Sequence, residues 1–284
     1  MKKNLDRFAN QKMLINRSKL AIIAGSGNLV DIYINICKKK NINFFLVGID
    51  KFYKNKKYKA DYILKLNNIG KIFYIMKLNN ISDIVFLGNV SKPEMYKLRP
   101  DIITLYYLII LFFYYFKGDD KLLTKIYNIF IKKGYKVIDP RVLLKKNIAN
   151  NKLNNYSQFK KIINIAQLKK YYYLAKEFGL KDLGQSIIVS KNSILLEEDR
   201  RGTDNLIYRY NKNVNKGKFD LLVKSSKPNQ NLYIDIPTIG PDTIINLYKS
   251  NLKGLIVECN KTFIVDPKKT FYLIKKYKLL YYAI

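Results

Sequence analysis

Short apolar runs alternate with amphipathic segments along most of the chain, a pattern typical of an α/β fold. Leu20–Ala24 is a compact apolar run that ends at Gly25, and Leu29–Cys37 follows with helix-compatible spacing. Asn43–Ile49 is a second apolar run, so this region predicts a strand, a tight turn, a helix and another strand. A strand–helix–strand unit implies a parallel sheet.

The same alternation continues through the first half of the chain. The apolar spacing predicts helices over Ile69–Leu78 and Leu122–Lys133. It predicts strands over Asp83–Leu87 and Tyr135–Ile138. These elements extend the parallel sheet.

Ile102–Phe116 differs from its surroundings because its fifteen residues carry no charge. A bilayer-spanning helix needs roughly 20 apolar residues, so a transmembrane segment is not expected. Two alternatives stay open for this stretch. It is either a helix buried in the core or in a homodimer interface, or an interfacial helix that places Tyr and Phe side chains among lipid headgroups.

The second half repeats the α/β pattern after a polar, asparagine-rich stretch over Asn147–Ser157. A helix is predicted over Ile162–Phe178, and Ser186–Ser190 and Ile194–Glu198 form a predicted β-hairpin. Further strands are predicted at Asp220–Lys224, Gly254–Glu258, Thr262–Val265 and Leu279–Ala283, with helices before about Leu252 and after Pro267.

The predicted organisation has four parts. Residues 1–17 are polar and basic, lack the apolar core of a secretion signal, and are expected to form a short tail. Residues 18–146 form a parallel-sheet domain, 147–160 a linker, and 161–284 a smaller C-terminal α/β domain.

The composition excludes several kinds of catalytic site but does not identify a binding partner. The formal net charge of +32 would attract nucleic acid or anionic lipid, but the lysines are spread along the whole chain and accompany abundant Asn, Ile and Tyr. An AT-rich coding sequence produces this bias without selection for a partner. The absence of histidine excludes a Ser-His-Asp triad, a Cys-His pair and a His-ligated zinc site. Cys37 and Cys259 show no disulfide or metal-ligand spacing, which fits a reducing cytoplasm.

Two glycine turns follow predicted strands of the first domain. Gly25-Ser26-Gly27-Asn28 leads into a helix, where free backbone N–H groups suit a phosphate. Val30 replaces the third glycine of the dinucleotide fingerprint, so a different phosphate ligand is as plausible as NAD, for which Asp50 would bind ribose. The turn after Leu87, which includes Asn89, is expected to face the same crevice because ligands collect beyond the carboxyl ends of parallel strands.

The segment Lys224–Asp242 concentrates reactive side chains between prolines and glycines, which predicts a functional loop rather than regular structure. The corner Asp199–Asp204 adds acidic, basic and hydroxyl groups. Cleavage of a diphosphate needs neutralised phosphate oxygens and an aligned water, and lysines with a carboxylate-held Mg²⁺ can provide both without histidine. These residue types match that need.

Eight motifs in register resemble the LpxI-type UDP-2,3-diacylglucosamine pyrophosphatases of lipid A synthesis, from Leu20 onward. They are Leu20-Ala-Ile-Ile-Ala-Gly-Ser-Gly27, Gly88-x-Val-x-Lys-Pro93, Gly118-Asp-Asp120, Asp182-Leu-Gly-Gln185, Gly202-Thr-Asp204, Lys227-Pro-x-Gln230, Asp235-x-Pro-Thr-Ile-Gly-Pro241 and Val257-Glu258. The resemblance implies a Rossmann-like N-terminal domain, a C-terminal α/β domain and substrate held between them. It implies attack of water on the α-phosphorus of UDP-2,3-diacylglucosamine, giving UMP and 2,3-diacylglucosamine 1-phosphate (lipid X), with Mg²⁺ as cofactor.

Membership implies a cytoplasmic enzyme peripheral to the inner membrane, and an essential aspartate that matches Asp235. The resulting site hypothesis assigns catalysis to Asp235, Asp204 and Thr203. It assigns substrate binding to Gly25, Ser26, Gly27, Asn89, Gln185, Lys224, Lys227 and Thr238, and metal binding to Asp235 and Glu198.

Three positions depart from the family pattern. Arg201 replaces an acid before Gly-Thr-Asp, and Asn231 and Tyr233 replace an Asp and an Arg. Fewer metal ligands are therefore expected. The alternatives are a nicotinamide-dependent oxidoreductase and a nucleic-acid-binding protein, although no nucleic-acid partner is expected from the resemblance.

Overall fold

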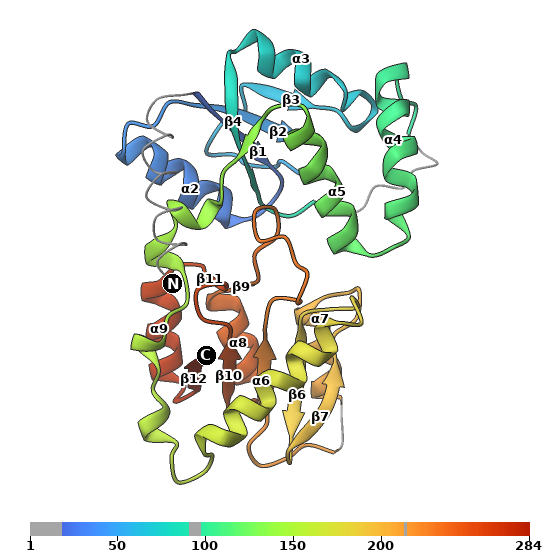
Figure 1. Cartoon of the computed structure of the whole chain (residues 1–284). Coiled ribbons are helices and arrows are strands. Elements are labelled where there is room, and N and C mark those ends of the chain that lie inside the picture. Colours follow the sequence, from blue (N-terminus) through green and yellow to red (C-terminus); the bar gives the residue numbers. More distant parts are fainter. Residues whose placement is uncertain (1–18, 91–97, 213–214) are drawn as a thin grey trace. The chain divides into compact units, whose positions relative to one another are not determined.

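Two compact units make up the computed structural model of the chain, which describes residues 19–90, 98–212 and 215–284 (Figure 1). The predicted tail (1–17) and Lys92-Pro93 lie outside the described residues. One unit comprises Met1–Lys145 and Asn231–Asp235, and the other comprises Lys146–Gln230 and Ile236–Ile284. The predicted α/β class is confirmed, with a separate sheet in each unit.

Unit 1 is built on a five-stranded, fully parallel sheet in the order β3-β2-β1-β4-β5. Its strands are β1 (Lys19–Ala24), β2 (Phe44–Ile49), β3 (Tyr62–Leu64), β4 (Ile81–Leu87) and β5 (Lys136–Val137). Its helices are α2 (Asn28–Lys39), α3 (Lys71–Leu78), α4 (Ile102–Tyr115) and α5 (Asp119–Lys132), with short 3₁₀ turns η1 (Leu66–Asn68) and η3 (Pro140–Val142). The predicted strand–helix–strand start is confirmed. Strand β3, inside a lysine-rich link, was not predicted.

Both faces of the unit 1 sheet are covered. Alternate residues of β1, Ala21 and Ile23, join a core cluster with Ile72 of α3 and Phe130 of α5. The intervening residue Ile22 is also fully buried. Burial on both faces explains why these strands read as continuous apolar runs rather than as an alternation.

Unit 2 contains a mixed five-stranded sheet in the order β12-β10-β8-β6-β7. Its strands are β6 (Ser186–Ser190), β7 (Ser193–Glu197), β8 (Leu221–Lys224), β10 (Gly254–Val257) and β12 (Leu280–Ala283), with a separate pair β9 (Thr238–Ile239) and β11 (Phe263–Ile264). Its helices are α6 (Ile165–Gly179), α7 (Thr203–Asn211), α8 (Pro241–Lys249) and α9 (Pro267–Lys276). The predicted hairpin β6–β7 is confirmed as antiparallel.

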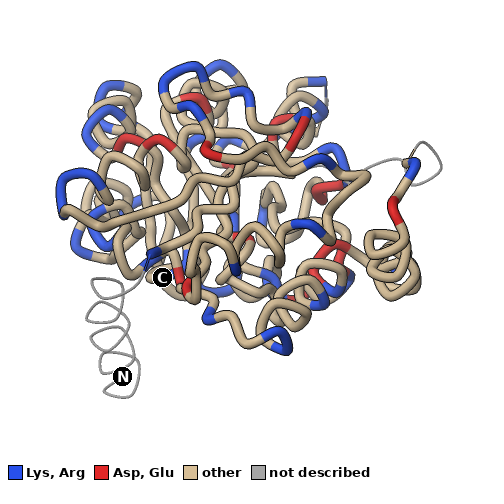
Figure 2. Tube along the Cα trace, turned by 90° about the horizontal axis from the view of Figure 1, so that it is seen from above, with Lys and Arg blue, Asp and Glu red and all other residues tan. Residues whose placement is uncertain are grey.

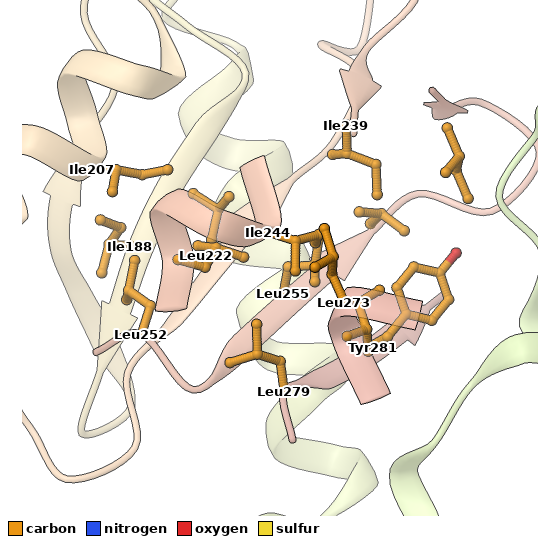
Figure 3. Packing of buried hydrophobic residues seen from close by; sticks show 14 of the residues in the cluster. Ile188, Ile207, Leu222, Ile239, Ile244, Leu252, Leu255, Leu273, Leu279 and Tyr281 are labelled. Carbon is orange, nitrogen blue, oxygen red and sulfur yellow. The ribbon is translucent and has the colours of Figure 1, made fainter. Parts of the chain in front are cut away.

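Helix α6 packs on one face of this sheet, and α7, α8 and α9 pack on the other. Figure 3 shows the second layer, in which Leu222 and Leu255 of the sheet meet Ile244 of α8 and Leu273 of α9. Helix α7 was not predicted, because its nine residues begin in a polar corner whose charges hide the apolar spacing.

Residues 147–160, predicted as a linker, fold onto unit 2 through the 3₁₀ turns η4 (Lys145–Asn147), η5 (Asn151–Leu153) and η6 (Tyr156–Gln158). The side chain of Asn154 donates to the Ala283 carbonyl (3.0 Å) and accepts from the Ala283 N–H (2.7 Å). Asn155 accepts from the Tyr281 N–H at 2.8 Å. These asparagine side chains thus hydrogen-bond to backbone groups of β12, which explains why the polar segment 147–160 packs on unit 2.

Candidate active site

The carboxyl end of β8 carries a group of polar and charged side chains. Lys224 ends β8 beside Val257, the last residue of parallel β10, and opposite Ser186, the first residue of antiparallel β6. The strand order therefore brings Lys224, Ser186 and the residue after β10, Glu258, to one edge of the sheet. Lys224 is 8% exposed and Glu258 is 4% exposed.

The Thr203 hydroxyl is the centre of the first group. It donates to Oε1 of Glu198 at 2.7 Å and accepts from Nζ of Lys224 at 3.1 Å. The Ser186 hydroxyl lies 3.1 Å from the Thr203 hydroxyl oxygen. Thr203 opens α7 directly after Gly202, whose φ of +86° is a conformation that favours glycine. The structure thus brings together the predicted residues Thr203, Glu198 and Lys224.

Both carboxylate oxygens of Glu198, a predicted metal ligand, accept hydrogen bonds from the protein. Its Oε2 accepts from the backbone N–H groups of Gln185 (2.5 Å) and Ser186 (2.9 Å), while Oε1 accepts from Thr203. These three hydrogen bonds offset the free-energy cost of burying the Glu198 carboxylate. This arrangement favours a role in positioning Thr203 and the Gln185–Ser186 backbone over direct metal ligation.

Glu258 is the centre of a second group, which the sequence reasoning assigned no role. Its Oε2 accepts from Lys176 Nζ (3.1 Å), from the Ser226 N–H (2.8 Å) and from the Ser226 hydroxyl (2.6 Å). Its Oε1 accepts from the Tyr172 hydroxyl at 3.1 Å and lies 2.7 Å from Lys261 Nζ. Five donors therefore fix this carboxylate at the end of β10.

Electrostatics around Glu258 follow from these contacts. Burial alone would raise the pKa of Glu258, but hydrogen bonds from Lys261, Ser226 and Lys176 and the charge of Lys176 together lower it to about 2. Burial raises the pKa of Tyr172, and the neighbouring Glu258 charge adds to this rise. Lys176 Nζ also donates to the Ser226 carbonyl at 2.6 Å. Lys176 and Glu258 therefore both bind Ser226 in the turn after β8.

The predicted binding residues Lys227 and Gln185 lie in this same turn region. Lys227 Nζ donates to Asp182 at 2.7 Å, and its backbone N–H donates to the side chain of Gln230 at 3.0 Å. Gln230 in turn donates to the Gln185 side chain at 3.4 Å. The motifs Asp182-Leu-Gly-Gln185 and Lys227-Pro-x-Gln230, separated by over forty positions, therefore bind one another.

Asp204 and Thr238 make different contacts. Asp204 is exposed in the first turn of α7 and accepts a hydrogen bond from Asn246 of α8 at 3.3 Å. Thr238, in β9, donates its hydroxyl to the Ile236 carbonyl at 2.9 Å. No further observation supports a catalytic role for Asp204, which stays a prediction.

In unit 1 the two glycine turns meet, as predicted. Ser26 and Asn89 form an antiparallel bridge with backbone hydrogen bonds of 3.0 and 2.8 Å, and the Ser26 hydroxyl donates to the Asn89 carbonyl at 3.1 Å. A Cβ on Gly25 would lie 2.4 Å from the Asn89 carbonyl oxygen, and one on Gly88 2.5 Å from the Ser26 carbonyl oxygen. Only glycines allow this approach, and the turn leads through Gly27 (φ +109°) into α2.

Asp235, the predicted catalytic acid, belongs by packing to unit 1 rather than to the predicted C-terminal domain. Its segment Asn231–Asp235 folds into a tight turn, since the Asn231 carbonyl accepts from the N–H groups of Ile234 and Asp235, both at 3.0 Å. Tyr233 packs against Tyr127 of α5 with ring centroids 5.5 Å apart and adds to the unit 1 core. Tyr233, one of the departures from the family pattern, is thus an apolar anchor.

Among the described residues, no group of three or more Asp, Glu, Cys or His side chains could hold a metal ion. Mg²⁺ is commonly held by only one or two carboxylates together with substrate phosphates. A single acid such as Asp235 is compatible with that mode. Asp199, by contrast, is paired with Arg201 at 2.5 Å, and this hydrogen bonding lowers its pKa to about 2.

The fold and these groups define a class of protein: a two-unit α/β protein with glycine turns at one sheet edge, and a buried lysine, carboxylates and hydroxyls at the edge of the other sheet. Comparisons with known proteins identify the family within this class. The model of the LpxI N-terminal domain matches residues 19–147, and that of the LpxI C-terminal domain matches residues 158–282.

The chain therefore belongs to the LpxI family. It is 28% identical over 258 residues to the UDP-2,3-diacylglucosamine pyrophosphatase LpxI of Caulobacter vibrioides, and the match covers 87% of this chain and 91% of that protein. The Glu258–Lys176–Ser226 cluster was not predicted from the sequence. Val257-Glu258 at a strand end was its one signal, because Lys176 lies on a helix among other lysines.

Proposed function

We propose that this protein is a hydrolase that cleaves the diphosphate of UDP-2,3-diacylglucosamine at the α-phosphorus to give UMP and 2,3-diacylglucosamine 1-phosphate. The observation that carries the proposal is the match of both units to LpxI, whose Caulobacter member is named for this substrate. The match favours neither a nicotinamide-dependent oxidoreductase nor a nucleic-acid-binding protein.

The residues of the β8 edge supply what diphosphate cleavage requires. Cleavage concentrates negative charge on the phosphate oxygens, and buried cations stabilise such charge more strongly than exposed ones because water screens them less. Lys224 is nearly buried, and Lys227 lies three residues further along the same turn. We assign both ammonium groups to the diphosphate oxygens, with Thr203 and Gln185 as hydrogen-bonding partners of the substrate.

Asp235 is assigned to the attacking water. Its carboxylate would orient the water and accept its proton as the new P–O bond forms at the α-phosphorus. The bond to the bridging oxygen then breaks, and that oxygen leaves on the sugar phosphate. Mg²⁺, held by Asp235 and the substrate phosphates, would supply additional charge neutralisation. In unit 1, Gly25, Ser26, Gly27 and Asn89 are assigned to substrate binding through their backbone and small side chains.

The chemistry of this substrate supports contact with a membrane, and membership in the LpxI family supports a cytoplasmic location. A diacylated sugar nucleotide is held in a bilayer by its acyl chains while its uridine diphosphate stays in water. We therefore place the protein in the cytoplasm, in peripheral contact with the cytoplasmic face of the inner membrane.

The test is hydrolysis in water labelled with heavy oxygen, with purified protein, UDP-2,3-diacylglucosamine and Mg²⁺. Attack at the α-phosphorus puts the label in UMP, whereas attack at the other phosphorus puts it in the sugar phosphate. Label in UMP, lost when Mg²⁺ is chelated, is the expected result. Absence of any cleavage would refute the proposed function, and label in the sugar phosphate would refute the position of attack.

A further inference from the structure

Helix α4 turns an apolar face outward. Eight of its apolar and aromatic side chains, or those directly after it, are between 47% and 87% exposed: Ile102, Ile103, Leu105, Tyr106, Ile109, Phe112, Phe113 and Phe116. The opposite face, with Thr104, Tyr107 and Leu108, is buried. Of the alternatives for this stretch, burial of this face in the core is therefore excluded. We call these eight residues the α4 stripe.

The spacing of the α4 stripe makes it continuous. Ile102, Leu105, Ile109, Phe112 and Phe116 recur every three or four residues, so they form one line along the helix, roughly 20 Å long at 1.5 Å per residue. Contiguous apolar surface of this kind marks an interaction site. Among the described residues, no helix is long and apolar enough to cross a bilayer, so the stripe is not a spanning segment.

Charged side chains lie at both ends of the stripe, with lysines at its carboxyl end. At its carboxyl end, the ammonium groups of Lys117 and Lys125 lie 5.6 and 4.9 Å from the ring centre of Tyr114. At its amino end, the Asp101 carboxylate accepts from the Thr104 N–H at 2.7 Å, which together with the nearby Lys71 charge lowers its pKa. Asp101 is thus engaged as a helix cap beside a lysine.

We propose that the α4 stripe docks on an anionic lipid surface. The stripe contains Tyr and Phe with aliphatic residues and no charge, which suits the headgroup boundary, and flanking lysines add attraction to anionic lipids. The competing occupant is a second copy of the chain. Two chains of net charge +32, with lysines and arginines spread along the coloured part of the trace (Figure 2), repel one another, whereas an anionic bilayer attracts both. Charge complementarity therefore favours lipid.

This inference goes beyond the proposed hydrolysis, because it names the surface that brings unit 1 to the membrane. It rests on exposure and charge in unit 1 and not on the residues of the β8 edge. Docking and catalysis can therefore succeed or fail separately.

The chain has no tryptophan, so a single introduced indole reports on its own position. In a Phe113→Trp variant, adding vesicles of phosphatidylglycerol and phosphatidylethanolamine should shift the emission to the blue, and brominated lipid should quench it. A Tyr173→Trp variant is the matched control, since Tyr173 of α6 is 62% exposed and Phe113 is 66% exposed. Its emission should not change. An unshifted indole at position 113, or equal shifts in both variants, would overturn the proposal.

Cosedimentation with the same vesicles gives an independent measurement. The double variant Ile109→Ser/Phe113→Ser should bind at least about tenfold more weakly, since it removes two large apolar side chains from the contact. Tyr173→Ser/Leu180→Ser should bind like the parent protein. A blue shift of Phe113→Trp without lipid, on raising protein concentration alone, would assign the stripe to a second copy and refute lipid docking.

Hydrolysis measured in detergent micelles separates this proposal from the proposed function. The Ile109→Ser/Phe113→Ser variant should retain the parent rate there, because it leaves the β8 edge intact. Vesicle binding that depends on the stripe, in a protein that never hydrolyses the substrate, would refute the function and sustain the docking surface. Hydrolysis with stripe-independent binding would do the reverse.

Discussion

The carboxyl edges of the two sheets are built in opposite ways. At the unit 1 edge, Gly25 and Gly88 let two turns approach closely, and the backbone of Ser26 bonds to Asn89. At the unit 2 edge, buried charged side chains converge, with Lys224 near Thr203 and Glu258 fixed by Lys176. The first edge can recognise a ligand through shape and main chain, whereas the second supplies charge.

Asp235 departs from this contrast, because it is a charged side chain that belongs to unit 1. The acid comes from the second half of the sequence but packs with unit 1 through Tyr233 and Tyr127. Unit 1 therefore contains an acidic side chain that comes from a segment distant in the sequence. If this contrast holds, substitution of charged side chains that contact the substrate should lower catalysis most, and substitution of the turn glycines should lower stability.

Substitution of Asp235 should have the largest effect. Asp235→Ala should lower kcat by about a thousandfold, because the loss of a group that acts on the attacking water removes transition-state stabilisation. Circular dichroism should show an unchanged fold. Asp242→Ala is the matched control, since Asp242 is exposed in the first turn of α8, and it should keep the parent rate. A fully active Asp235→Ala variant would exclude this residue from the reaction.

Lys224→Met should lower kcat/KM by about a hundredfold, because a nearly buried cation is lost from the phosphate-binding edge. Lys191→Met changes an exposed lysine in the β6–β7 turn and should have little effect. Steady-state kinetics on both variants makes the measurement. Equal rates for the two would mean that the buried cation contributes no more than the general positive charge.

Glu258→Gln should destabilise the protein at neutral pH by on the order of 3 kcal/mol, because the pKa of Glu258 is lowered from 4.5 to about 2 by its donors. The stabilisation from a lowered carboxyl pKa is fully present above the unfolded value and is lost as pH falls toward the folded value. The parent and the variant should therefore converge in stability between about pH 5 and pH 2. Denaturant unfolding at several pH values measures this, and a pH-independent difference would contradict it.

Gly25→Ala should destabilise unit 1 by about 1–3 kcal/mol, because the added Cβ would lie 2.4 Å from a backbone oxygen of Asn89 and the turns must separate. Gly134→Ala meets no atom within 4 Å but carries the strain of φ +86°, so it should cost less, about 1 kcal/mol. Urea unfolding compares the two. A larger loss for Gly134→Ala would show that close approach is not what requires Gly25.

Ser26→Ala should have the smallest effect. Its hydroxyl donates only to the exposed Asn89 carbonyl, and the backbone bridge to Asn89 stays. A change in KM below about fivefold is expected, since a net hydrogen bond contributes about 1 kcal/mol at most sites. A tenfold rise in KM would show that the unit 1 edge binds substrate through this side chain.

Much of the fold was predictable because it depends on local patterns. Leu20–Ala24 and Ser186–Ser190 read as strands from short apolar runs, and the structure has strands at both places. Helix α7 and strand β3 were missed, since the first is short and charged at its start and the second is only three residues long. The asparagines at positions 154 and 155 were read as a linker because their partners in β12 lie more than 120 positions away.

The candidate site was predictable as a set of residues but not as an arrangement. The site hypothesis named Lys224, Thr203 and Glu198, of which only Thr203 lies in a motif, yet only the structure shows the Thr203 hydroxyl between the other two. Lys176, 82 positions from Glu258, left no signal at all, because a lysine on a lysine-rich helix looks like a solvated charge.

By itself, the sequence determined the alternation of strands and helices, the two glycine turns and the exclusion of histidine chemistry, because each depends on composition or on neighbours a few positions apart. Only the tertiary structure decided that Asn231–Asp235 packs with unit 1, that Glu198 is held by backbone donors, and that the α4 stripe faces outward. These features depend on contacts between distant segments. Local periodicity reports that a helix has an apolar face, but the partner of that face is set by the packing of the whole unit.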